Sequence, residues 1–461
     1  MKYNKNSFFL KHPHPGNKLL VLCIPLLLLS FISASVGTAF SHVGGSFAAL
    51  ATLARLFDSA AWIFVSGAVS ASLVALIMEN RLTDADKIKL EVQKGLFAYE
   101  YGNPLNLKEG ERLPKIRCKK VGKGLYEITV TTVSRTVEDI QKIASSISSS
   151  LNKRYARYAV TESNADVAFN EVSFRIEDVK INRSLTVNGV NDLTPKEHTK
   201  LIIQDGTYID LTTSGSMIFA GKTRSGKTTG AISVLLQALL AGRDKYGSEI
   251  VIIDPKMAEL SQLPHTFTLD EDGEARRILE AMMHFETAIR KRQQALNNLS
   301  IEKGDAVHWW DAGFHSSILF IDEYVALRNI FPKRASKEDS EYSLAAFDSV
   351  LKRIVTMGAS AGCYVMISIA EASVDEGGLP AMLRSACSTK ILFRPTLPEG
   401  RFLWDSERLK DMPQRTYGSG DAWFSSADGV HDSVSYVHFP ALNFPVYREL
   451  GRLLAAYYRV S

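Results

Sequence analysis

The chain has 461 residues, of which 46% are hydrophobic and 23% charged, and this balance excludes an intrinsically disordered protein. Its length allows two or three domains. The formal net charge of +4 does not by itself indicate a nucleic acid partner, although a ring of subunits would multiply the basic side chains that line its channel. The four cysteines lack metal-ligand spacing, so we expect reduced thiols: Cys23, Cys118, Cys363 and Cys387.

The N-terminal region predicts a basic tail followed by two membrane spans. Residues 1–18 contain lysines and no acidic residue, whereas residues 19–40 and 60–78 are apolar. A helix needs roughly 20 residues to cross a bilayer, and both stretches are close to that length. Positive charge precedes the first stretch and follows the second. The positive-inside rule therefore predicts a two-span hairpin in the cell membrane, with both termini in the cytoplasm.

A second interpretation makes the first apolar stretch a cleaved signal peptide. Lysines, an apolar centre and the small residues Ala34, Ser35 and Gly37 follow in the order that signal peptides show. Residues 60–78 would then form a single span, and the P-loop could lie outside the cell, where ATP is scarce. The positive-inside rule favours the hairpin instead. Between the spans, residues 47–58 either lie on the outer surface or extend the second helix.

Residues 79–206 predict a small α+β module between the membrane and the rest of the chain. Its apolar pattern alternates between strand and helix periods. The expected elements are strands at residues 115–120, 124–133, 155–161 and 167–176 and a helix at residues 137–151. Such a module grips a partner or shapes a ring, and the structural role is the simpler expectation.

Residues 207–461 predict an ATPase domain of the α/β class. Gly221, four further residues and Gly226-Lys227-Thr228 form the P-loop pattern between an apolar run and an apolar-periodic helix. Glycines let the backbone N–H groups surround phosphates, and the helix N-terminus adds partial positive charge. We expect Lys227 to contact the β- and γ-phosphates of ATP and Thr228 to hold Mg²⁺. The predicted nucleotide-binding residues are Gly221, Lys222, Thr223, Arg224, Ser225, Gly226, Lys227, Thr228 and Thr229.

Two adjacent carboxylates predict the second half of the site. Asp322 and Glu323 directly follow the apolar residues 318–321, and strand ends of a parallel sheet face the ligand. Strands that end in Asp-Glu also occur without this function, but here one follows a P-loop. We expect Asp322 to bind Mg²⁺ and Glu323 to orient or deprotonate the attacking water, with Lys227 as the third catalytic residue.

Other apolar segments predict the rest of a largely parallel sheet. Helical segments separate the expected strands, and an amphipathic helix is expected at residues 446–458. The expected strands are at residues 250–253, 318–321, 364–369 and 390–393.

Asp254-Pro255-Lys256 makes a family recognisable. Together with residues 319–327 and Gly358 to Gly362, this element resembles the FtsK/SpoIIIE family of DNA-translocating ATPases over residues 214–393. The resemblance implies a RecA/HerA-like P-loop fold, Mg²⁺-ATP as cofactor, DNA as the translocated partner and a homo-hexameric ring.

The order of the segments narrows the resemblance. Two spans, a small module and one motor domain resemble the TcpA-like coupling proteins of Gram-positive mobile elements. This implies a membrane-anchored DNA translocase that delivers DNA, with its relaxase, to a conjugative type IV secretion channel. Two alternatives stay open. One is a nucleotide-controlled docking platform for a relaxase–DNA complex without motor activity, and the other is an FtsK-like DNA pump for segregation or plasmid spread.

Two positions depart from the family pattern. Family members usually carry Gln-Arg where this chain has Ala370-Glu371, and an Arg where it has Ala359. The first departure supports the platform alternative, because the Gln senses the γ-phosphate. The candidates for a replacement cation are Arg353, Arg384, Arg394 and Arg401.

The sequence offers few candidates for DNA contact. Arg290-Lys291-Arg292 lies on a helix expected to begin near Glu274, but three consecutive residues spread their charges around a helix. His308-Trp309-Trp310 either stacks on bases or packs at a subunit contact. His12-Pro13-His14-Pro15 is expected to belong to a flexible tail rather than to a metal site.

Overall fold

The computed structural model describes residues 2–43, 48–98, 103–181, 183–337, 341–370, 378–409, 417–429 and 431–459. The chain forms two compact units, Met1–Ile181 and Asn182–Ser461, which we call the N-terminal unit and the P-loop unit. The sequence placed this boundary at residue 206, but residues 200–204 already belong to the P-loop unit. The backbone of Ile202 exchanges hydrogen bonds of 2.7 and 3.0 Å with the side chain of Gln237 in the P-loop helix.

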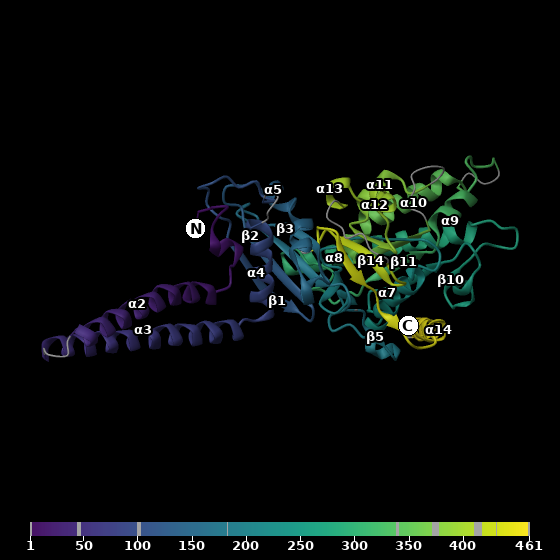
Figure 1. Ribbon diagram of the computed structural model, residues 1–461. Coiled ribbons are helices and arrows are strands. Elements are labelled where there is room, and N and C mark those ends of the chain that lie inside the picture. The colour runs from purple at the N-terminus through teal and green to yellow at the C-terminus, as the bar shows by residue number, and fades with distance from the viewer. Residues whose placement is uncertain are drawn as a thin grey trace. The chain divides into compact units, whose positions relative to one another are not determined.

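A long helical hairpin begins the N-terminal unit. Helices α2 (Gly16–Val43) and α3 (Ala48–Asn80) lie side by side (Figure 1). Alanines recur every seven residues on the buried face of α3, where small side chains let two helices approach closely: Ala54, Ala61, Ala68 and Ala75. Both helices are long and apolar enough to cross a membrane. The described residues 48–58 extend α3, in agreement with one of the two expectations for that segment.

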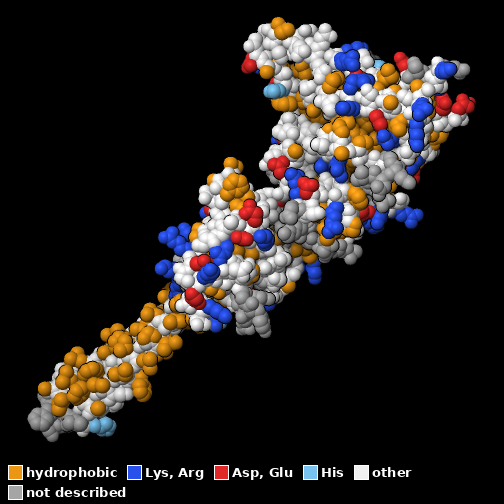
Figure 2. Space-filling model, turned by 90° about the horizontal axis from the view of Figure 1, so that it is seen from above, with side chains coloured by type: hydrophobic (Ala, Val, Ile, Leu, Met, Phe, Trp, Pro, Cys, Tyr) orange, Lys and Arg blue, Asp and Glu red, His pale blue; other side chains and the backbone are white. Residues whose placement is uncertain are grey.

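The large apolar side chains of the hairpin point outward. Phe31 and Trp62 are 73% and 74% exposed, and Figure 2 shows hydrophobic side chains over the surface of the hairpin. A water-soluble helix pair buries such side chains, whereas a bilayer solvates them. The hairpin therefore has the surface expected of a membrane anchor.

The remainder of the N-terminal unit is a four-stranded antiparallel sheet with helices. The strand order is β1-β2-β4-β3, and apolar side chains of β2 and β4 pack against α4 and α6. The elements are α1 (Phe8–Lys11), α4 (Asp84–Phe97), β1 (Ile116–Gly122), β2 (Leu125–Thr131), α5 (Val137–Gln141), α6 (Ala144–Ser150), β3 (Tyr158–Ala165) and β4 (Glu171–Asp178). The single helix predicted at residues 137–151 is two short helices, because a turn at Lys142 and Ile143 interrupts it.

The described N-terminal residues pack on this sheet. Tyr3 and Leu10 are buried among its apolar side chains. The Tyr3 N–H donates to the Glu111 carbonyl (2.7 Å), and the Tyr3 carbonyl accepts from Gly110 (3.0 Å). The flexible tail was expected at residues 12–15, where His14 contacts Glu79 and the His12 carbonyl accepts from the Asn17 side chain (3.1 Å).

The P-loop unit is built on an eight-stranded sheet with the order β10-β9-β11-β12-β8-β13-β14-β15. Strands β8 to β13 are parallel, which confirms the α/β fold class, whereas β14 and β15 extend the sheet antiparallel and were not predicted. The strands are β5 (Thr186–Val187), β6 (Lys200–Gln204), β7 (Thr207–Asp210), β8 (Met217–Ala220), β9 (Ile250–Ile253), β10 (Thr266–Phe267), β11 (Ser317–Ile321), β12 (Cys363–Ile369), β13 (Thr389–Phe393), β14 (Asp421–Ser426), β15 (Ser435–His438) and β16 (Ala441–Leu442).

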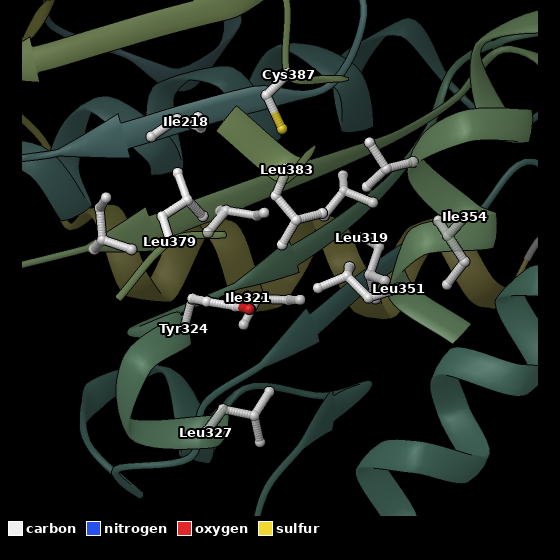
Figure 3. Close-up of a cluster of buried hydrophobic side chains, with 14 of the residues drawn as sticks. Ile218, Leu319, Ile321, Tyr324, Leu327, Leu351, Ile354, Leu379, Leu383 and Cys387 are labelled. Atoms are coloured by element: carbon white, nitrogen blue, oxygen red, sulfur yellow. The ribbon is translucent and has the colours of Figure 1, made fainter. Parts of the chain in front are cut away.

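Helices cover both faces of this sheet, so the central strands β8, β9 and β11 are buried at every position and mostly apolar. The helices are α7 (Lys227–Ala241), α8 (Arg276–Lys303), α9 (Tyr324–Ile330), α10 (Leu344–Met357), α11 (Ala381–Ala386), α12 (Leu397–Leu403), α13 (Ser406–Leu409) and α14 (Val446–Arg459). Ile218 and Ile321 face α9, α10 and α11 (Figure 3), whereas Phe219 and Phe320 face α7 and α14. This packing brings the carboxyl ends of β8, β9, β11 and β12 to one edge.

Candidate nucleotide-hydrolysis site

The P-loop takes the backbone path that its glycines allow. It leaves β8 at Gly221 and enters α7 at Lys227. Gly221 and Gly226 have φ angles of +146° and +97°, a region that side chains with a Cβ rarely occupy. The Gly230 N–H donates to the Gly226 carbonyl (2.8 Å) and so closes the first turn of α7. The predicted strand–loop–helix arrangement is therefore present.

Neighbouring loops hold the P-loop in place. The Gly221 N–H donates to the Ile369 carbonyl at the end of β12 (3.1 Å), and the Gly420 N–H donates to the Ser225 carbonyl (3.0 Å). A Cβ on Gly226 would lie 2.6 Å from the Gly420 nitrogen. Glycine is therefore required at position 226 both for its φ angle and because the loop before β14 approaches closely. The sequence did not predict this approach.

Asp322 and Glu323 follow β11, which lies between β9 and β12. The Asp322 N–H donates to the Ile253 carbonyl of β9 (2.9 Å), so the strand pairing continues to this residue. Glu323 has φ +58°, which is unusual for a residue with a side chain, and its side chain is 11% exposed. Such backbone conformations persist only where the surroundings enforce them, and they concentrate at functional sites.

Both oxygens of Glu323 are engaged. Its Oε2 lies 2.9 Å from Lys256 Nζ and 3.5 Å from Lys227 Nζ, and its Oε1 accepts from the Ala370 N–H at 2.9 Å. Burial acts to raise the pKa of Glu323, but Lys227, Lys256 and the Ala370 N–H outweigh it, so the pKa lies below its ordinary value. Burial also lowers the pKa of Lys227, which the nearby carboxylates only partly offset.

The Asp254-Pro255-Lys256 element is a turn that presents Lys256 to Glu323. Asp254 is fully buried after β9, and its two carboxylate oxygens accept from the backbone N–H groups of Lys256 (3.1 Å) and Ala258 (2.9 Å). The turn therefore fixes the backbone from which the Lys256 side chain reaches the Glu323 carboxylate. Neither Asp254 nor Pro255 lines the cavity between the P-loop and the strand ends.

A cavity of about 310 Å³ opens between the P-loop and the ends of β9 and β11. Most predicted nucleotide-binding and catalytic residues line it, whereas Gly221 and Ser225 do not. The predicted residues in its lining are Lys222, Thr223, Arg224, Gly226, Lys227, Thr228, Thr229, Lys256, Asp322 and Glu323. Tyr447 of α14 also lines it and was missed, because nothing in the sequence connects the last helix with the P-loop.

Thr228 and Asp322 fit a magnesium ion. Both line the same cavity, and Mg²⁺ is usually held by one or two protein oxygens together with substrate phosphates and water. Burial raises the pKa of Asp322 despite the opposing effects of the Ser368 hydroxyl and the Lys227 ammonium. A cation bound beside Asp322 would therefore compensate a carboxylate that is poorly hydrated.

A second cavity, of about 230 Å³, lies on the other side of the P-loop. It shares Gly226 and Thr229 with the first cavity and is completed by residues from the C-terminal part of the unit, including Asp421 and His438. His438 Nδ1 lies 2.9 Å from Asp421 Oδ1. Two cavities therefore adjoin the end of the P-loop at Gly226 and Thr229.

Two of the four candidate arginines are committed to other contacts. Arg353 donates two hydrogen bonds of 2.8 Å to the Glu286 carboxylate, and Arg384 donates to a backbone carbonyl of α12 (2.9 Å). Arg394 and Arg401 are exposed, and their guanidinium groups have no partner among the residues that the structure describes. Ala370 contributes only its backbone to the site, and Glu371 lies outside the described residues.

The predicted DNA-contact candidates are largely structural. Arg292 is 1% exposed, pairs with Asp244 (Nη1–Oδ2, 3.1 Å) and donates to two backbone carbonyls at 2.9 and 2.6 Å. Arg290 pairs with Glu286 at 2.6 Å, which leaves Lys291 as the exposed residue without a partner among those described. The three charges are therefore spread around the helix, as expected, and Arg292 is buried and cannot contact DNA.

The His308-Trp309-Trp310 segment does not present its central ring to solvent. Trp309 is buried beneath Gly362, where a Cβ would lie 2.8 Å from the indole ring. His308 stacks on Trp310, with ring centroids 4.5 Å apart. Trp309 therefore neither stacks on bases nor packs at a subunit contact, the two alternatives for this segment, because it fills the core of the unit.

Comparison with known proteins identifies the central part of the P-loop unit. The model of the FtsK/SpoIIIE family matches residues 192–374. No curated protein sequence matches the chain.

Several solved structures are similar to the chain. TcpA, the conjugation coupling protein of pCW3, solved in monomer form with ATPγS, is 14% identical, with 80% of this chain and 99% of that chain covered and a TM-score of 0.48. ATPases 2 and 3 of EssC from Geobacillus thermodenitrificans are 17% identical, with 61% and 53% covered and a TM-score of 0.43. The cytoplasmic domain of the type VII secretion ATPase EccC from Thermomonospora curvata is 15% identical, with 58% and 32% covered and a TM-score of 0.41.

The family match spans the P-loop, the Asp254-Pro255-Lys256 turn and the Asp322-Glu323 pair. Residues 192–374 of this chain are therefore similar to the FtsK/SpoIIIE family.

Proposed function

We propose that the chain is a membrane-anchored ATPase that uses Mg²⁺-ATP to move DNA and delivers it to a conjugative secretion channel. One observation supports the catalytic part above others: Lys227, Asp322 and Glu323 line a single cavity within an FtsK/SpoIIIE-family domain. The order of two spans, a small module and one motor domain, as in TcpA-like coupling proteins, supports the coupling role. Both termini then lie in the cytoplasm, with relaxase and channel components as partners and a homo-hexamer as the working ring.

The residues divide the catalytic work by their positions. In this proposal the P-loop N–H groups and Lys227 hold the β- and γ-phosphates, and Thr228 and Asp322 hold Mg²⁺, which neutralises charge on the phosphates when bound. Glu323 orients the attacking water and accepts its proton. The second cavity beside Thr229 fits the nucleoside half of ATP, because it lies on the opposite side of the P-loop from Glu323.

DNA-stimulated hydrolysis tests the motor. The full-length protein in lipid nanodiscs is expected to hydrolyse ATP severalfold faster when double- or single-stranded DNA is added, because a translocase couples turnover to its track. The phosphate-release assay would include a polyanion without bases, such as heparin, as the control for charge alone. An ATPase rate that DNA leaves unchanged would contradict the motor.

A docking platform is the second candidate, and Ala370 favours it. At the position where family members carry a γ-phosphate-sensing Gln, this chain offers only a backbone N–H, which donates to Glu323. A platform would bind ATP and a relaxase–DNA complex but would show little stimulation by DNA. A pump for segregation or plasmid spread uses the same chemistry as the leading proposal, and its partners would be division proteins instead of a relaxase.

Lys256 is expected to act as a positioning residue. Lys256→Gln removes the 2.9 Å contact to Glu323 Oε2, so we expect kcat for ATP hydrolysis to fall about tenfold with little change in KM. Lys303→Gln is the matched control, because Lys303 is exposed at the end of α8 and lies outside the cavity. A raised KM with unchanged kcat would instead mean that Lys256 binds the nucleotide.

A further inference from the structure

A pocket in the N-terminal unit lies where the helical hairpin begins. It has a volume of about 480 Å³, and its lining comes from α1, the start of α2, α4 and β1. Four basic side chains line it, and among its described residues there is no Asp or Glu: Lys18, Lys89, Lys115 and Arg117. Figure 2 shows Lys and Arg side chains gathered at this end of the hydrophobic hairpin.

Three of these cations form no ion pair with a described carboxylate. Arg117 pairs with Glu171, but Lys18, Lys89 and Lys115 have no carboxylate partner among the residues that the structure describes. Nearby acids have other hydrogen-bond partners: Glu79 binds His14 (2.5 Å), and the Asp86 carboxylate accepts from the Thr83 hydroxyl and N–H. Lys89 lies near enough to Asp86 to help lower its pKa, but it forms no ion pair with it. The pocket therefore carries net positive charge that a ligand can neutralise.

The floor of the pocket is apolar and its walls are fixed. Leu10, Phe97 and Ile116 are buried beneath it. The start of α2 lies close against the last part of α3. A Cβ on Gly16 would lie only 3.0 Å from the Ala75 carbonyl oxygen. The pairing of Tyr3 with residues 110 and 111 fixes the N-terminal segment. A ligand here would meet both cations and an apolar surface in a preformed site.

The position of Lys18 relates the pocket to the bilayer. Residues 19–40 of α2 contain no charge, so Lys18 lies where an inserted hairpin leaves the hydrocarbon. We propose that the pocket lined by Lys18, Lys89 and Lys115 binds the headgroup of an anionic phospholipid. This proposal rests on the membrane anchoring proposed above. Basic pockets at the cytoplasmic ends of spans hold such headgroups, and the apolar floor fits the glycerol and first acyl carbons.

Two features favour a lipid over a nucleic acid backbone. A phosphodiester of DNA would satisfy the lysines but would place no apolar group on Leu10, Phe97 and Ile116. The pocket also adjoins the hydrophobic surface of the hairpin, from which a lipid can enter without leaving the membrane. A free phosphate shares the chemistry of the headgroup, and competition with inorganic phosphate distinguishes the two.

The test uses the full-length chain in detergent and native mass spectrometry with added phosphatidylglycerol, phosphatidylcholine or inorganic phosphate. We expect selective retention of phosphatidylglycerol. The triple variant K18Q/K89Q/K115Q is expected to lose about tenfold or more of this binding, because each lysine near a headgroup contributes several-fold. The matched control K120Q/K123Q/K180Q changes three exposed lysines of the same unit outside the pocket, and it should bind as the unchanged protein does.

Three outcomes would overturn the proposal. Equal losses of lipid binding in both triple variants would mean that the lipid responds to general surface charge. Displacement of the lipid by millimolar inorganic phosphate would mean that the pocket is a simple anion site. Displacement of the lipid by a DNA oligonucleotide would mean that the pocket binds nucleic acid. K18R/K89R/K115R should retain binding, which separates lost charge from lost folding. Alkaline extraction of membranes tests anchoring separately, since a hairpin that inserts without selective lipid retention would refute the pocket alone.

Discussion

Glu323→Gln is expected to reduce the steady-state rate of ATP hydrolysis by about 10²–10⁴-fold while ATP still binds, because a general base contributes that range and the amide cannot accept the proton of water. The amide keeps the size of the side chain and can still accept a hydrogen bond from Lys256 or the Ala370 N–H. Lys227→Ala is expected to lose nucleotide binding as well, because it removes the ammonium that the P-loop places in the cavity. Phosphate release and binding of a fluorescent ATP analogue measure the two effects.

The comparison of these variants tests the division of roles. Glu302→Gln is the control, because Glu302 is exposed near the end of α8 and lies outside the cavity. If Glu323→Gln hydrolysed ATP at the rate of the unchanged protein, Glu323 would not be the base. If both Glu323→Gln and Lys227→Ala also supported normal DNA transfer between cells, ATP hydrolysis at this site would not drive the transfer.

Arg292→Met is expected to lower the free energy of unfolding of the P-loop unit by about 3–5 kcal/mol, because it leaves a buried carboxylate without its cation. The side chains of Arg292 and Asp244 are 1% and 2% exposed. Asp244 also accepts from the backbone N–H of His315 (2.5 Å), so the pair joins the loop after α7 to the strand region before β11. Denaturant unfolding followed by tryptophan fluorescence measures the loss.

Lys291→Met is the control for this variant. Lys291 precedes Arg292 on the same helix but is exposed, so its replacement is expected to change the free energy of unfolding by at most about 0.5 kcal/mol. Equal unfolding midpoints for the two variants would show that Arg292 is not part of the core. DNA affinity that falls with Arg292→Met while stability is unchanged would restore Arg292 as a DNA contact.

Local patterns predicted the P-loop, because the glycines, the lysine and the helix start are consecutive residues. They also predicted the central parallel strands, whose burial on both faces requires continuous apolar runs. Strands β14 and β15 were missed, because they lie among turns and polar residues and pair antiparallel at the sheet edge. Trp309 and Arg292 were misjudged for one reason: the burial of a polar or aromatic residue depends on partners that are distant in sequence.

The sequence by itself determined which residues can bind a nucleotide and which segments can enter a membrane, because both properties reside in short contiguous patterns. Only the tertiary structure decided that Lys256 reaches Glu323, that Gly420 closes on Gly226 and that Tyr447 lines the cavity. It also decided that Lys18, Lys89 and Lys115 share one pocket. These contacts join segments far apart in the chain. In the P-loop unit, helices packed on both faces of the sheet bring the segments together, and in the N-terminal unit the hydrogen-bonded N-terminal segment does so.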